Sequence, residues 1–246
     1  MLFNEPTPTA YDLKFRVLGI PVRVHPLFWL IAVLMGMRGN PQPAEILLWV
    51  GAVFVSILVH EMGHALAARA CGWQPWITLH GFGGLASYRP TYRSPMNQVL
   101  ITLAGPVAGF LFAATIVAFI QASGHRVEFG WHGGLFPFAY EGFNAHRLNM
   151  LIDDLLFINI FWGLINLLPI LPLDGGQIAQ EVLQLMSPGD GLRQAFWLSI
   201  LVAIGAGILA WTRLHDQYLT FFCAYFAYSN YMSLQAFYGR GGGGFR

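Results

Sequence analysis

The sequence predicts an all-α polytopic membrane protein with about six transmembrane helices and a small β-hairpin after the second. Two observations predict this class. Of the 246 residues, 56% are hydrophobic and only 10% are charged, with a mean hydropathy of +0.54, whereas an average soluble domain carries about 25% charged residues. The hydrophobic residues also gather into six apolar runs, as expected for a chain that crosses a bilayer several times.

The apolar runs set the expected domain organisation. One transmembrane domain is predicted over residues 1–236, with its metal-binding core at about 44–176, followed by a flexible, glycine-rich tail at 237–246. The first run is shorter than the roughly 20 residues that cross a hydrocarbon core, so it could be tilted, partly interfacial or extended upstream. The six runs cover residues 24–37, 44–71, 98–121, 154–173, 192–211 and 217–236.

The charged residues predict the orientation of the spans and exclude one class of partner. With six spans, nine of the 13 Lys and Arg residues fall on the side that bears the N-terminus. Because cytosolic loops hold the excess of Lys and Arg, both termini are expected in the cytosol. The formal net charge of +1, without a basic stripe, argues against a nucleic acid as a partner.

The second run contains an ionisable cluster, HEMGH at residues 60–64. His60 and His64 are one helical turn apart, so their imidazoles project from one face about 40° apart, which suits two ligands of one tetrahedral zinc ion. Glu61 projects beside that position, where it could act as a base on a water molecule. Ionisable groups inside a membrane usually pair, bind a ligand or mark a pathway. A purely structural His–Glu–His network is the alternative.

A catalytic zinc site normally takes three protein ligands, and Asp174 is the candidate for the third. It lies in INLLPILPLDGGQ, residues 165–177, where prolines end or bend the fourth span and glycines permit a sharp turn. Asp174 could instead be a simple turn or cap residue. The six-span topology favours the ligand, because it brings His60, His64 and Asp174 to the same, cytosolic side of the bilayer.

These motifs resemble those of the site-2 proteases, which are zinc metalloproteases that cut proteins within membranes. The matching elements are HEMGH at 60–64 and NLLPILPLDGG at 166–176, in the expected order and on separate spans. The sequence AGP at 104–106, in the third span, is a weaker match. The chain is similar to the compact form of the family, without a PDZ or CBS domain.

The resemblance implies specific roles for the clustered residues. His60, His64 and Asp174 are the implied ligands of one zinc ion per chain, and Glu61 is the implied catalytic base. The expected setting is a bacterial or archaeal cell membrane, with the active site toward the cytosol.

Three further residues are candidates for substrate binding. The amide of Asn166 could hold the substrate backbone or help to stabilise an oxyanion, and an interhelical hydrogen bond is the equally weighted alternative. Asn159, seven residues earlier, is expected only to pack. Short apolar runs within residues 75–93 flank Gly83 and Gly84 and predict a hairpin. Because the family places a re-entrant sheet there, its exposed edge could pair with an extended substrate.

The function that these expectations favour is intramembrane zinc endopeptidase activity. The substrate would be a membrane-anchored protein cut in or near its transmembrane segment, as in regulated intramembrane proteolysis. The expected partners are that substrate, the lipid bilayer and a regulatory membrane protein. The alternative is a non-catalytic, zinc-containing membrane protein that binds transmembrane partners. The presence of Glu61 weighs against this alternative, because zinc binding alone does not need a base.

Overall fold

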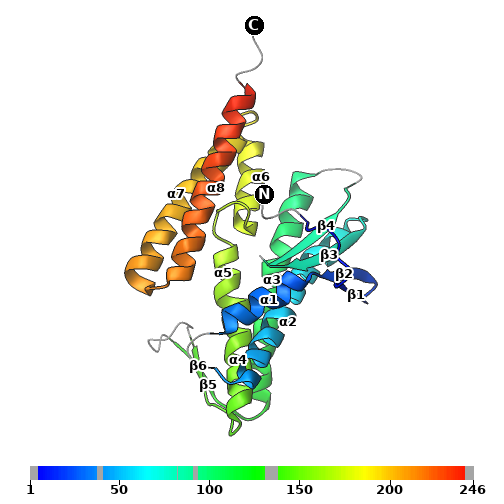
Figure 1. The fold of residues 1–246 in the computed structure, drawn as a ribbon, viewed down its shortest axis with the longest axis vertical. Coiled ribbons are helices and arrows are strands. Elements are labelled where there is room, and N and C mark those ends of the chain that lie inside the picture. Colours follow the sequence, from blue (N-terminus) through cyan, green and yellow to red (C-terminus); the bar gives the residue numbers. More distant parts are fainter. Residues whose placement is uncertain (1–4, 38–40, 82, 91–93, 131–137, 242–246) are drawn as a thin grey trace. The chain divides into compact units, whose positions relative to one another are not determined.

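The computed structural model describes residues 5–37, 41–81, 83–90, 94–130 and 138–241 (Figure 1). The chain divides into two compact units, one made of residues 1–91 and 104–163 and the other of residues 92–103 and 164–246. Helix α3, Pro95–Ala122, contributes to both.

The first unit contains a mixed sheet at its N-terminal end. The order of the strands is β1 (Leu13–Val17), β2 (Ile20–Val24), β3 (Pro75–His80) and β4 (Gly83–Tyr88). The pairs β1–β2 and β3–β4 are antiparallel, and β2–β3 is parallel. The last two strands lie in the segment that the sequence predicts as a hairpin. Strands β1 and β2 are not expected from the sequence, which predicts helices and one hairpin only.

The alternation of side chains explains why residues 13–24 form strands. Val22 and Val24 face the hydrophobic core of the unit together with Ile77 and Leu79, while Lys14 lies opposite Arg23 on the other face. A period of two is the pattern of a half-buried strand. The turn between the strands is tight, because Leu18 and Gly19 both have positive φ angles, as two-residue hairpin turns require.

Helices complete the first unit. The long helix α2 (Pro43–Ala70) packs against α1 (Pro26–Gly36), the sheet and α4 (His146–Leu156). The helix that begins with α4 continues as the π-helical segment η1 (Phe157–Trp162). Within it, Asn159 Nδ2 donates to Ser56 Oγ of α2 at 2.8 Å, so Asn159 makes a packing contact, as the sequence predicts. The two short strands β5 (Val127–Phe129) and β6 (Phe138–Tyr140) pair before α4.

The second unit is helical. The short helix α5 (Gly163–Asn166) begins at its border and is followed by a loop. Helix α6 (Asp174–Met186) packs on α7 (Gly191–Leu209), which is extended by η2 (Ala210–Leu214) and lies along α8 (Gln217–Gly241), as Figure 1 shows. The predicted tail begins inside α8 at residue 237, and residues 242–246 lie outside the described part of the chain.

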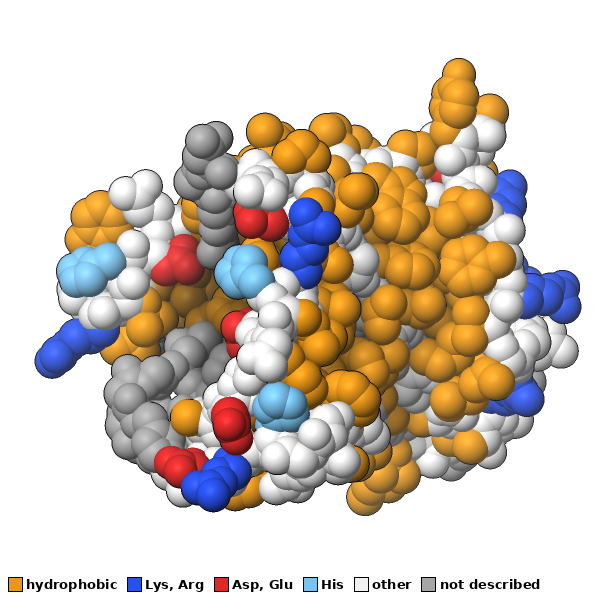
Figure 2. Space-filling view, turned by 90° about the horizontal axis from the view of Figure 1, so that it is seen from below, with side chains coloured by type: hydrophobic (Ala, Val, Ile, Leu, Met, Phe, Trp, Pro, Cys, Tyr) orange, Lys and Arg blue, Asp and Glu red, His pale blue; other side chains and the backbone are white. Residues whose placement is uncertain are grey.

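Four helices in the described residues are long and apolar enough to cross a membrane. They are Pro43–Ala70, Pro95–Ala122, His146–Asn166 and Gly191–Leu214. Many of their large hydrophobic side chains are exposed, and Figure 2 shows such side chains covering much of one face. The chain is therefore an integral membrane protein. The predicted count of six spans remains a prediction.

Two of the predicted spans differ from the structure in length or position. The first corresponds to α1, whose 11 residues reach only about 16 Å, against a hydrocarbon core of about 30 Å. The helix that corresponds to the fourth predicted span covers His146–Asn166 rather than residues 154–173. It ends before Pro169, because proline cannot continue the backbone hydrogen bonds of a helix.

Candidate metal centre

One half of the predicted site lies on α2, in the first unit. His60 Nε2 and His64 Nε2 are 3.1 Å apart, and their rings meet nearly edge to face, at 81°. Glu61 and His64 are buried, at 6% and 8% exposure. The helical spacing therefore places both imidazoles at one point, with Glu61 close by in the sequence and shielded from solvent.

The separation of the two imidazole nitrogens fits a shared metal ion. Two nitrogen ligands about 2.0–2.1 Å from one tetrahedral zinc ion lie roughly 3.3–3.4 Å apart. The observed 3.1 Å is close to that distance. Neutral imidazole is also a common zinc ligand, so both the chemistry and the spacing of His60 and His64 suit zinc.

Two glycines let backbone approach these side chains closely. A Cβ atom at Gly105, in α3, would overlap the imidazole of His64, and a Cβ at Gly84, in β4, would overlap the carboxyl group of Glu61. Any larger residue would therefore displace a predicted site residue. Gly105 is the middle residue of the AGP element, whose weak match to the family gave no hint of this steric role.

The hairpin brings its second strand past Glu61. Gly83 has a φ of +123°, which favours glycine, and it pairs with His80 at the start of β4. Within the described sheet, β4 pairs only with β3 and is an edge strand. The predicted substrate-binding residues Gly83 and Gly84 thus lie on an edge strand beside the predicted base.

The other half of the predicted site lies in the second unit. Asp174 is buried, at 6% exposure, and is the first residue of α6, where the helix dipole favours a negative charge. Asn166 Nδ2 donates to Asp174 Oδ2 at 2.7 Å. This contact joins α5 to α6 and orients the carboxylate, so it is of the interhelical kind that the sequence analysis gives as one alternative for Asn166.

The glycines after Asp174 act differently from the sequence-based expectation, whereas the helix ends before Pro169, as the prolines predict. Gly175 and Gly176 do not form a sharp loop turn. Both lie at the helical N-terminus of α6. A Cβ atom at either position would overlap the backbone of residues 167–171. These glycines therefore allow α6 to pack tightly against the loop that precedes Asp174.

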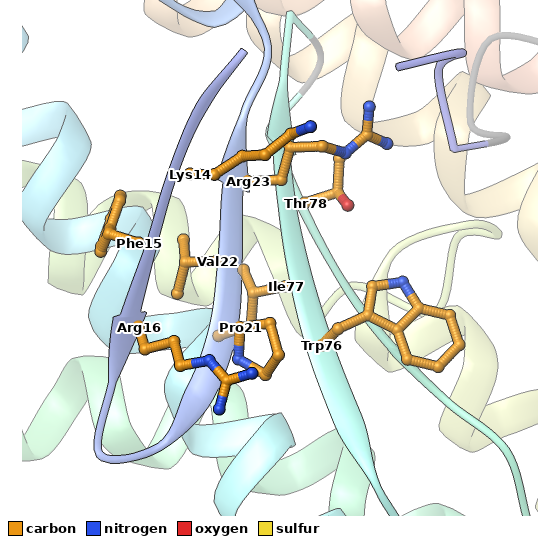
Figure 3. Close-up of a pocket in the computed structure, with 9 residues that line it drawn as sticks. All are labelled: Lys14, Phe15, Arg16, Pro21, Val22, Arg23, Trp76, Ile77 and Thr78. Carbon is orange, nitrogen blue, oxygen red and sulfur yellow. The ribbon is translucent and has the colours of Figure 1, made fainter.

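A pocket of about 470 Å³ lies on the outer face of the sheet and is separate from the predicted site residues. Figure 3 shows that Lys14, Arg23 and Thr78 line one end, and Arg16 and Trp76 the other. Glu5 binds at this face: its carboxylate accepts hydrogen bonds from Arg23, Thr78 and Trp76. These bonds fasten the N-terminal segment to β2 and β3.

Two titratable groups near this face have shifted pKa values. Hydrogen bonds from Thr9 and the guanidinium of Arg23 lower the pKa of Asp12 to about 2. Burial and the neighbouring His25 and Arg23 lower the pKa of His80, on β3. The lowered pKa favours the neutral form of His80, which is buried within the sheet.

Comparison with known proteins places this chain in a family. The model for peptidase family M50 matches residues 49–209, more than half of the chain. The chain belongs to peptidase family M50. The resemblance to site-2 proteases is thereby confirmed at the level of the family, and the match includes both predicted halves of the site.

Relatives of this M50 chain come from several organisms. A Synechocystis protein whose name calls it a candidate zinc metalloprotease is 32% identical over 177 residues, covering 67% of this chain and 42% of that protein. A zinc metalloprotease of Methanocaldococcus jannaschii is 27% identical, covering 70% of this chain and 46% of that protein. The chain thus spans less than half the length of these relatives.

The fold of this M50 chain is also that of a solved structure. The site-2 protease from Methanocaldococcus jannaschii matches with a TM-score of 0.59, covering 91% of this chain and 95% of that chain. At 21% sequence identity, this likeness concerns the fold.

Proposed function

We propose that this M50 chain is an intramembrane zinc endopeptidase that hydrolyses peptide bonds in or near the transmembrane segments of membrane-anchored proteins. The observation that carries the proposal is the pair of converging imidazoles, His60 and His64, with the buried carboxyl group of Glu61 on the same helix. That helix, α2, is long and apolar enough to cross a membrane. The zinc metalloprotease names of the relatives support the same activity.

The proposed zinc site takes one ligand atom from each of three side chains. His60 and His64 of α2 and Asp174 at the start of α6 are the proposed ligands, because they belong to the two sequence motifs and because the two imidazole nitrogens converge. Two imidazoles and a carboxylate suit a catalytic zinc ion and leave a coordination position open. When bound, zinc would supply Lewis acidity, which lowers the pKa of water and polarises a carbonyl group.

Glu61 is the proposed general base. It would accept a proton from water and deliver it to the leaving amine, so that one carboxyl group serves both proton transfers. Its burial keeps it from bulk solvent, and the close backbone of Gly84 limits its side-chain positions. Asn166 would hold the Asp174 carboxylate in place through its amide.

The outer edge of β4, at the end of the described sheet, is the proposed docking position for the substrate. A transmembrane helix hides its peptide bonds, so the segment to be cut must unwind before hydrolysis. An extended segment that pairs with the edge strand at Gly83 and Gly84 would lie beside Glu61. The remaining partners are the bilayer and a regulatory membrane protein.

The proposed topology has six spans. The four apolar helices would be joined by α1 and α8, with both termini and the active site on the cytosolic side. The distribution of Lys and Arg residues supports this orientation.

The variant Glu61→Gln tests the proposal. It keeps the size of the side chain and both imidazoles but removes the base, so zinc content should stay at about one ion per chain while hydrolysis falls by at least about 100-fold. Metal analysis and cleavage of a membrane-anchored reporter measure the two quantities. Near-normal hydrolysis would reject Glu61 as the base.

The same two measurements, zinc content and reporter cleavage, distinguish the protease from the alternative, a non-catalytic zinc-containing membrane protein. A non-catalytic zinc protein would bind zinc and membrane partners in both forms and would cut no reporter in either. Comparison of membrane proteomes from cells with the native chain and with Glu61→Gln would then reveal no fragment that ends within a span. Such a result would favour the binding protein over the protease.

A further inference from the structure

We propose that Ser199 and Asn230 are positioning residues that hold the loop carrying Asp174 in one conformation and so preset its carboxylate for metal binding. This inference rests on the proposed role of Asp174 as a zinc ligand. Both residues lie beyond the segment that carries the family motifs, on α7 and α8.

The two side chains bind both polar backbone groups of one loop residue. The N–H of Leu171 donates to Ser199 Oγ at 3.0 Å, and Asn230 Nδ2 donates to the carbonyl oxygen of Leu171 at 2.7 Å. Ser199 and Asn230 are 1% and 3% exposed. Each therefore acts inside the unit, shielded from water, where a lost hydrogen bond leaves a buried polar group unsatisfied.

The loop needs such support because of its sequence. Pro169 and Pro172 carry no backbone N–H, and the loop between α5 and α6 belongs to no helix or sheet. The N–H groups of Leu167, Leu168, Ile170 and Leu173 bond to carbonyl oxygens of neighbouring residues. The polar groups of Leu171 instead take side-chain partners from other helices. Gln177 Nε2 adds a bond to the carbonyl oxygen of Pro172, at 3.0 Å.

Ser199 and Asn230 are themselves fixed by their own helices. Ser199 Oγ donates to the carbonyl oxygen of Ala195 at 2.8 Å, so the hydroxyl hydrogen is used and a lone pair is left to accept from Leu171. Asn230 Nδ2 also donates to the carbonyl oxygen of Phe226, at 2.8 Å. Both side chains are thus oriented before they contact the loop.

The hydrogen bonds from Ser199 and Asn230 to Leu171, together called the clamp, act on Asp174 through a short stretch of chain. Leu171 is three residues before Asp174, and Gly175 and Gly176 pack against the backbone of residues 167–171. Asn166, at the other end of the loop, binds the Asp174 carboxylate. A loop held at Leu171 therefore holds the position of the first turn of α6 and of the carboxylate that it carries.

Zinc affinity of the full-length chain in detergent is the measurement that tests the clamp. In Ser199→Ala the N–H of Leu171 loses its acceptor, and we expect zinc affinity to fall about 10-fold, at the low end of losses seen when partners that orient ligands are removed. Competition with a chelator at a temperature well below unfolding gives the affinity. Ser199→Thr keeps the hydroxyl group and should bind zinc with the affinity of the native chain.

Two further variants complete the test. Ser233→Ala is the matched control, because Ser233 Oγ bonds only to Ser229 of its own helix in the described structure and is exposed; its zinc affinity should not change. If Ser199→Ala does not fold, Ser199→Cys replaces it, since sulfur is a weaker acceptor, and a fall in zinc affinity is again expected.

A double variant links the effect to Asp174. In an Asp174→Ala background, Ser199→Ala should cause no further loss of zinc affinity, because the ligand that it positions is gone. Unchanged zinc affinity in Ser199→Ala, or an equal loss in both backgrounds, would overturn the clamp. Unchanged zinc affinity in Asp174→Ala alone would instead overturn the proposed ligand, and the clamp with it.

Discussion

At the scale of single residues, the lack of a side chain at Gly105 is as important as the imidazole that it faces. A Cβ atom at this position would overlap the ring of His64. Gly105→Ala should therefore push His64 away from His60 and lower zinc affinity by about 10- to 100-fold. Chelator competition measures the change.

The control for this substitution is Gly51→Ala on α2, where no atom lies within 4 Å of the added Cβ. Zinc affinity should be unchanged there, and stability should rise slightly, because alanine is the better helix former. If both variants bind zinc normally, the position of His64 does not depend on the space at Gly105.

Gly84 should affect catalysis rather than metal binding. A Cβ atom there would overlap the Glu61 carboxyl group, and a misplacement of about 1 Å can lower a rate by about 100-fold. We expect Gly84→Ala to keep zinc but to lower kcat by about that factor. Gly205→Ala, which has open space around it, is the control, and full activity in Gly84→Ala would show that β4 does not constrain the base.

At the scale of elements, the sheet contains a titratable group that makes its stability depend on pH. The pKa of His80 is lowered in the folded chain, mainly by burial and then by His25 and Arg23, while Glu5 opposes the shift. The unfolded chain therefore binds the proton first as the pH falls. Stability should be greatest above about pH 6.5 and should fall below it, toward the lower pKa of the folded state.

Thermal unfolding between pH 5 and pH 8, roughly one and a half units on either side of the free-histidine pKa, measures this dependence. In His80→Gln the part of the pH dependence of stability that comes from His80 should disappear, because glutamine does not titrate. An unchanged dependence of stability on pH would assign that dependence to other groups.

The helices show where periodicity alone misplaces a boundary. The apolar run predicts that the fourth span begins at Asp154, yet the helix begins at His146. There the Tyr140 hydroxyl donates to Asp153 Oδ1 at 2.7 Å. This exposed hydrogen bond gives Asp153 a partner in β6, so the aspartate lies inside the helix rather than before it.

At the scale of the whole molecule, membrane topology is the property still to be tested. The Lys and Arg distribution predicts six spans with both termini in the cytosol. Reporter fusions after α2, α3 and α7 and at the C-terminus should give cytosolic, non-cytosolic, non-cytosolic and cytosolic signals, respectively.

The C-terminal fusion is the most informative of these. Helix α8 has 25 residues but is not among the four helices that meet the length and hydropathy of a span. A non-cytosolic signal at the C-terminus would show that α8 does not cross, and the six-span topology would be wrong.

The sequence by itself determined the membrane class, the family motifs and the residues on which the proposed chemistry depends. These are local properties: composition, helical periodicity and the four-residue spacing of His60 and His64 act within one segment. The sequence also predicts a hairpin within residues 75–93, because its turn residues and short apolar runs lie next to each other.

Only the tertiary structure decided what surrounds those residues. It placed the backbone of Gly84 at Glu61, that of Gly105 at His64, and Asn230 at Leu171, which is 59 positions away in the sequence. Such contacts depend on how distant segments pack, and no local pattern encodes the partner of a buried serine or asparagine. The signal that was available, a polar residue inside an apolar helix, indicates that a partner exists without naming it.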